Sequence, residues 1–132
     1  VIEQDGHIGH GAIIHSARVC RNALIGMGAV VNDNAVVGES AFVAAMAFVK
    51  AGMQVPARTL AAGIPAKVMR ELSEDELAWK LDATRVYQNL ARRSLASLRE
   101  TVALTEEEPG RKRLSMAEVL PLSAWKNKKA GG

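Results

Sequence analysis

Three histidines, the side chains of this sequence best suited to metal or acid–base chemistry, fall within nine residues: His7, His10 and His15. Imidazole is the commonest protein ligand of zinc, and three imidazoles with one water form a tetrahedral catalytic site. A single imidazole can instead act as a general base. The outer surface of a repeat structure also tolerates histidine without any chemical role. The elements that carry these residues therefore decide between the three interpretations.

A six-residue repeat runs through the first 55 positions. Aliphatic residues recur at this spacing: Val19, Ile25, Val31, Val37, Val43, Val49 and Val55. An alanine lies four residues after each of the first five. A period of six fits neither an amphipathic helix nor an alternating strand. It predicts a chain that turns a corner every six residues, with short parallel strands stacked coil upon coil. We therefore predict an all-β solenoid, a left-handed parallel β-helix of hexapeptide repeats, followed by a C-terminal α-helix.

The same period extends upstream through Ile2, Ile8 and Ile14, but one residue out of register. This shift predicts a one-residue shortening between Ile14 and Val19, at a corner of the coil.

The spacing of His10 and His15 bears on where a metal ion could bind. Residues five apart in a six-residue period fall on adjacent faces of a triangular coil, so the two side chains of one chain diverge. If three solenoids pack about a threefold axis, faces of neighbouring chains meet. His10 of one subunit could then approach His15 of the next. The spacing therefore predicts a metal ion bound at an interface between chains, not one bound within a single chain.

The repeat is expected to end after Val55, since Pro56 cannot donate a ladder hydrogen bond. The Gly/Pro turn at 63–67 ends one element and starts another. Ser73 and Glu76 then form a capping box. They predict a helix from about Glu74 to Val102 whose apolar stripe packs on the outside of a β-helix.

The domain prediction follows from these boundaries. Residues 1–68 form the C-terminal coils of the β-helix, 69–103 an amphipathic helix packed on the solenoid, and 104–132 a flexible charged tail.

Composition excludes several classes of function. Apolar residues make up 48% of the chain and aromatic residues only 4%, which predicts an aliphatic core. The net charge of +3 forms no basic stripe, so we expect no nucleic-acid partner. No run of about 18 apolar residues suggests a membrane span. The single cysteine, Cys20, fits a reducing cytoplasm. The chain opens on Val1 inside a repeat, so we expect that an N-terminal portion precedes it.

Several stretches carry a resemblance to a known family. The segment IGHGAIIH at 8–15 resembles the zinc-binding stretch of γ-class carbonic anhydrases. The segments at 23–28, 43–52, 63–67 and 73–79 narrow the likeness. Together they are similar to the hexapeptide-repeat proteins of that family found with phenylacetate degradation and with the carnitine pathway. The resemblance covers residues 1 to about 100.

The resemblance implies a homotrimer with one metal site per subunit interface, occupied by Zn²⁺ or by Fe²⁺ or Co²⁺. It matches His10 and His15 to the second and third histidine ligands of the family. The first histidine and the residues that assist catalysis would lie upstream of Val1, so we expect weak metal binding by this chain. His7 matches no ligand position and is interpreted as a surface residue.

Three functions stay open at this point. The first is a metal-dependent hydratase or hydrolase that acts on CO₂/bicarbonate or on a CoA thioester and is impaired in this chain. The second is a CoA-dependent acyltransferase in which His10 or His15 is the general base. The third is a non-catalytic trimeric scaffold. Bound zinc would favour the first, and acetyl-CoA affinity without zinc would favour the second.

Overall fold

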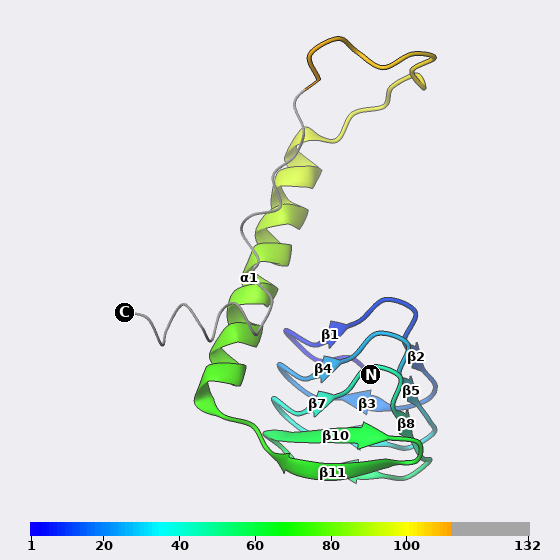
Figure 1. Cartoon of the computed structure of the whole chain (residues 1–132), viewed down its shortest axis with the longest axis vertical. Helices are drawn as coiled ribbons and strands as arrows, with labels where there is room; N and C mark the ends of the chain where they lie inside the picture. The colour runs from blue at the N-terminus through cyan, green and yellow to red at the C-terminus, as the bar shows by residue number, and fades with distance from the viewer. Residues whose placement is uncertain (112–132) are drawn as a thin grey trace. The chain divides into compact units, whose positions relative to one another are not determined.

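Short parallel strands stacked in three columns form the body of the computed structural model, which describes residues 1–111 (Figure 1). Each strand of the first nine holds two residues, and the second of the two points inward in most of them. Their bounds are β1 His7–Ile8, β2 Ile13–Ile14, β3 Arg18–Val19, β4 Leu24–Ile25, β5 Val30–Val31, β6 Val36–Val37, β7 Phe42–Val43, β8 Phe48–Val49 and β9 Gln54–Val55. The predicted left-handed parallel β-helix followed by an α-helix is confirmed; the β-helix has about three turns, and one helix follows it in the described residues.

The three sides of the coil are three sheets, ordered β1-β4-β7-β10-β11, β2-β5-β8 and β3-β6-β9. The residues of the six-residue repeat fill the interior between them. The seven in-phase aliphatic residues from Val19 to Val55 are at most 2% exposed, and the five alanines that follow them at most 1%. Burying one such aliphatic side chain contributes about 1.5–3 kcal/mol. The repeat therefore supplies the core, one layer per coil.

One corner of the first coil is shorter than its counterpart in the second. Ile14 pairs with Val31, 17 residues on, whereas Val19 pairs with Val37, 18 residues on. The backbone then turns through a left-handed residue, Ser16, with φ of 48°. The predicted shortening between Ile14 and Val19 is confirmed.

The β-helix continues for one strand after Val55, where the six-residue repeat ends, and this strand lies within the predicted range 1–68. Strand β10 (Thr59–Gly63) pairs in parallel with β7, and β11 (Ala66–Glu71) folds back antiparallel on β10. Ala61 takes the inward position and is fully buried. Thr59 takes the position that alanine holds in the earlier coils, four residues after Val55, and its hydroxyl donates to the Pro56 carbonyl at 2.9 Å.

The helix α1 spans Glu74–Ser97, and its predicted capping box is present. The Glu76 N–H donates to Ser73 Oγ at 3.3 Å, and the Ser73 N–H donates to the Glu76 carboxylate at 3.0 Å. The helix ends five residues before the predicted Val102. Val102 is 86% exposed and β-branched, so neither burial nor intrinsic propensity extends the helix to it.

The chain divides into two compact units, with the first ending at Leu81 and the second beginning at Asp82. The first contains the β-helix and the first two turns of α1; the second contains the rest of α1. Residues 98–111 form no helix or strand. The remainder of the predicted tail, 112–132, lies outside the described residues. Within residues 1–111 no helix has the length and apolar character needed to cross a membrane.

Candidate functional site

His15 occupies the shortened corner between β2 and β3, where it contacts an acidic side chain of the next coil. Its Nδ1 atom lies 3.1 Å from Oδ1 of Asp33. The side chains are 66% and 47% exposed. A carboxylate at Nδ1 favours the tautomer that carries its proton there, which leaves Nε2 with a lone pair directed away from Asp33. The pair thus has the arrangement of an oriented base or ligand at the surface.

His10 lies at the preceding corner, between β1 and β2, and is exposed. Its carbonyl accepts a hydrogen bond from the Gly28 N–H at 2.9 Å, which fixes the corner against the next coil. His10 and His15 therefore stand at the two corners that bound one sheet, β2-β5-β8. The sequence analysis expected the two histidines on adjacent faces of the coil. In the structure they lie at the two ends of one face, because five residues span one whole side of the shortened coil.

The two candidate metal residues are not gathered into a cluster by one chain. Among residues 1–111 no group of three or more His, Cys, Asp and Glu side chains could hold a metal ion. The residues of a single described chain thus do not fit a complete metal site.

His7 lies in β1 and is half-buried, so it is less exposed than its interpretation as a surface residue implied. Burial lowers the pKa of its imidazole, and the positive charges of Lys80 and His10 lower it further. The physical reason is that the first two turns of α1 belong to the same compact unit as the β-helix and cover this part of its surface. The repeat pattern alone does not indicate which side the helix covers.

Lys80, which the sequence analysis did not single out, is the largest fully buried side chain of the described residues and is 1% exposed. Its ammonium group donates to Asn22 Oδ1 at 2.7 Å and to the Asp5 carbonyl. Burial lowers its pKa from 10.5 to about 8, against the opposing charge of Asp5. One signal was available: Lys80 lies three residues after Leu77, on the apolar stripe of the helix.

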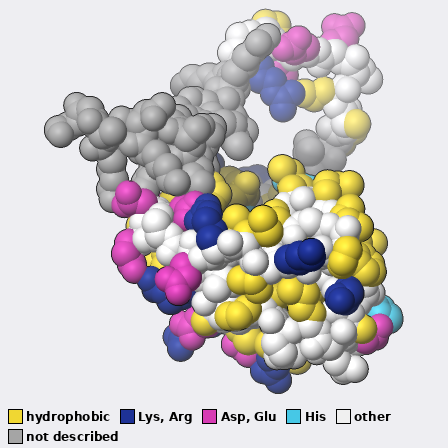
Figure 2. Space-filling view, turned by 60° about the horizontal axis from the view of Figure 1, so that its bottom comes forward, with side chains coloured by type: hydrophobic (Ala, Val, Ile, Leu, Met, Phe, Trp, Pro, Cys, Tyr) yellow, Lys and Arg dark blue, Asp and Glu magenta, His cyan; other side chains and the backbone are white. Residues whose placement is uncertain are grey.

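The sheet between His10 and His15 carries apolar side chains on its outer surface. Ile13 and Phe48 are 56% and 38% exposed there, and Met27 and Met46 at the adjoining corner are 58% and 67% exposed. Hydrophobic side chains with isolated Lys and Arg among them are also visible in Figure 2, which brings forward the end of the β-helix where β10 and β11 lie. Exposed apolar surface of this kind is typical of contacts between proteins.

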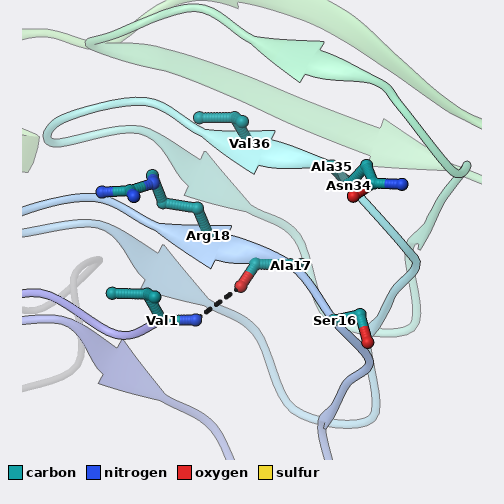
Figure 3. A pocket seen from close by; sticks show the side chains of 7 residues that line it. All are labelled: Val1, Ser16, Ala17, Arg18, Asn34, Ala35 and Val36. Carbon is teal, nitrogen blue, oxygen red and sulfur yellow. Dashed lines mark hydrogen bonds between the residues drawn. The ribbon is translucent and has the colours of Figure 1, made fainter.

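A depression of about 390 Å³ lies on a different side, at β3 and β6 (Figure 3). Arg18 and Val36 line it, and the Val1 nitrogen donates to the Ala17 carbonyl at 2.7 Å beside it. The Arg18 guanidinium is already bonded to the Glu3 carboxylate at 2.8 Å. No histidine lines this depression, so it does not extend the site at His10 and His15.

The fold and the repeat define the class of this protein, because a parallel β-solenoid of this kind is the hexapeptide-repeat β-helix fold. Its sequence is similar to that of the carnitine operon protein CaiE from Salmonella dublin and Salmonella newport, with 50% identity over 125 residues. The match covers 94% of this chain but 63% of each relative, so the chain spans less than two thirds of their length. A comparison with models of known protein families gives no match.

Solved structures of similar fold are described as transferases. A Bacillus cereus protein described as a candidate acetyltransferase is 37% identical with a TM-score of 0.68, and the match covers 70% of this chain and 54% of that one. A hexapeptide transferase family protein from Anaplasma phagocytophilum is 28% identical with a TM-score of 0.60, covering 70% and 63%. The serine acetyltransferase of Brucella abortus is 28% identical with a TM-score of 0.50, covering 55% and 32%.

Proposed function

We propose that this chain contributes to a CoA-dependent acyltransferase in which His15 is the general base. The observation that carries the proposal is the contact between His15 Nδ1 and the Asp33 carboxylate. A carboxylate beside Nδ1 can orient an imidazole so that Nε2 faces the acceptor, as in other sites with a histidine base. The similarity to transferase structures supports the same class of reaction.

The reaction assigned to this site is acyl transfer from a CoA thioester to a hydroxyl or amine. Nε2 of His15 accepts the acceptor proton while the acceptor oxygen or nitrogen attacks the thioester carbonyl carbon. The new C–O or C–N bond forms and the C–S bond breaks. The proton then passes from His15 to the departing thiolate, which leaves as the CoA thiol. Atoms and charge balance without a further reactant.

A homotrimer is part of the proposal. The surface between His10 and His15 exposes Ile13, Phe48 and Met46 to solvent in a single chain. Side-by-side packing of a second β-helix would cover them and would enclose the otherwise open His15 in a groove between chains. Sedimentation at micromolar concentration should show a trimer, and a monomer would overturn this part of the proposal.

A metal-dependent hydratase or thioesterase is the second candidate, and the same contact supports it. A carboxylate behind a histidine orients a metal-ligating imidazole as well as a catalytic base. Exposed His10 and His15 at opposite corners suit a site that two chains share. Because one chain does not supply a complete donor set, we assign no step to a metal ion.

The two candidates differ in which histidine variants matter. Release of CoA thiol from acetyl-CoA would be followed with a panel of amine and hydroxyl acceptors, with and without a chelator. In acyl transfer, His15→Asn abolishes acceptor-dependent thiol release, whereas His10→Asn retains most of it and the chelator has no effect. Loss of acceptor-independent thiol release in both variants, with sensitivity to the chelator, would instead support metal-dependent thioester hydrolysis.

A further inference from the structure

The buried ammonium group of Lys80 ties the start of α1 to one corner of the β-helix. It donates to the Asp5 carbonyl and to Asn22 Oδ1, and Asn22 Nδ2 donates in turn to Ser40 Oγ at 2.9 Å. Asp5, Asn22 and Ser40 occupy equivalent corner positions of consecutive coils and share a left-handed backbone, with φ of 59°, 57° and 55°. We call these three residues the corner column. Lys80 is thus hydrogen-bonded to two coils of the β-helix, and Asn22 links it to Ser40 of the third coil.

The acceptors of Lys80 are uncharged, which makes its burial unusual. A carbonyl and a side-chain amide oxygen satisfy its donors but do not neutralise its charge, so desolvation of the ammonium group is only partly offset. The charged or titratable groups that act on it from the β-helix are the Asp5 carboxylate, which favours the ammonium form, and the His7 imidazole, whose cationic form opposes it. On the helix itself, the Glu76 carboxylate is bonded to Arg70 at 2.8 Å.

Lys80 lies directly after the residues that pack the first turn of α1 on the β-helix. Leu77 belongs to the apolar cluster that docks the first turn of α1 against Phe42, with Trp79 packed beside it. Lys80 follows directly, and Leu81 is the last residue of the first compact unit. Lys80 therefore lies at the end of the helical segment that shares a compact unit with the β-helix.

We propose that Lys80 is a pH-dependent latch that fastens the first two turns of α1 to the corner column and tightens when it loses its proton. When these turns leave the β-helix, the ammonium group regains water and binds its proton at the ordinary affinity. When they dock, the proton is held less strongly, as the lowered pKa of about 8 indicates. Docking therefore releases protons between about pH 8 and pH 10.5 and is strengthened as the pH rises through this range.

Trp79 supplies a reporter for the test. In the full chain with Trp125→Phe, Trp79 is the one remaining tryptophan, and its fluorescence follows the docking of the first helical turns. Urea titrations at pH 8 and pH 10 would compare this protein with Lys80→Met. Lys67→Met, which removes an exposed lysine of β11, is the matched control. The difference between the first two proteins isolates Lys80 from other groups that titrate in this range.

The expected result is a docking constant that rises roughly 40-fold from pH 8 to pH 10 in the parent and in Lys67→Met, and that lacks this increase in Lys80→Met. An equal pH dependence in the parent and in Lys80→Met would overturn the proposal. If Lys80→Met does not fold, the ¹³Cε resonance of Lys80 in the parent gives the answer. A titration midpoint near pH 8 supports the latch, and a midpoint near 10.5 contradicts it.

Discussion

His15 Nδ1 and Asp33 Oδ1 lie 3.1 Å apart because two consecutive coils turn the same corner with different numbers of residues. Between the inward Ile14 and the left-handed Ser16 there is one residue, whereas Asn32 and Asp33 both lie between their counterparts Val31 and Asn34. Asp33 thus has no equivalent in the first coil. Its carboxylate reaches the imidazole of the shorter corner, so a deletion in the repeat creates the candidate site.

Replacing Asp33 with Asn should lower the kcat/KM of His15-dependent chemistry by about 10–100-fold, as for other residues that orient a catalytic or ligating histidine. The variant removes the charge that selects the Nδ1–H tautomer, so ¹⁵N NMR should show a changed tautomer ratio at His15. Glu39→Gln, an exposed acid at another corner, is the control. An unchanged tautomer ratio and unchanged kcat/KM in Asp33→Asn would show that Asp33 does not orient His15.

Replacing Ala35 with Leu should destabilise the β-helix by about 1–3 kcal/mol or more, because the fully buried corner has no room for added methylenes. Urea unfolding measures the loss. Ala51→Leu, at an exposed corner, should cost far less. Equal stability of Ala35→Leu and the parent would mean that the assigned register is incorrect.

Gly26 tests the close approach of consecutive coils. A Cβ atom added there would lie 2.4 Å from the backbone nitrogen of Ala45, a contact that requires the backbone to shift. Gly26→Ala should therefore lower the melting temperature by several degrees. Gly52→Asn is the comparison, since its left-handed position faces open space and asparagine tolerates that conformation. Equal melting temperatures for the two variants would contradict the coil spacing.

His7 should make stability depend on acidity. Its pKa in the folded chain is lowered below 6.5, first by burial and then by Lys80 and His10. As the pH falls through about 6.5, the unfolded chain takes up this proton before the folded one, so stability present above that pH is lost below it. The free energy of unfolding should fall more between pH 7.5 and 5.5 in the parent than in His7→Gln. The same fall in both proteins would argue against the contribution of His7.

The six-residue period was enough to predict the β-helix, because each inward position depends only on its neighbours in the coils above and below. It also located the shortened corner between Ile14 and Val19. It did not show that Asp33 would stand against His15, since that contact depends on the residue count of two separate corners.

The contacts between the helix and the β-helix could not be predicted from the sequence. Lys80 lies on the apolar stripe of α1, but its acceptors, Asp5 and Asn22, come from corners 75 and 58 residues away. Which sheet the helix covers depends on the β10–β11 hairpin that carries the chain to Ser73. His7 was interpreted as exposed for the same reason.

The most direct test of the proposed acyl transfer measures acceptor-dependent release of CoA thiol. The zinc content of the purified protein is measured first, and the metal-depleted protein is then assayed. If His15 is the general base, the protein binds acetyl-CoA without stoichiometric zinc, and thiol release is lost in His15→Asn and retained in His7→Asn. Thiol release that requires zinc, or that is unaffected by His15→Asn, would contradict this proposal.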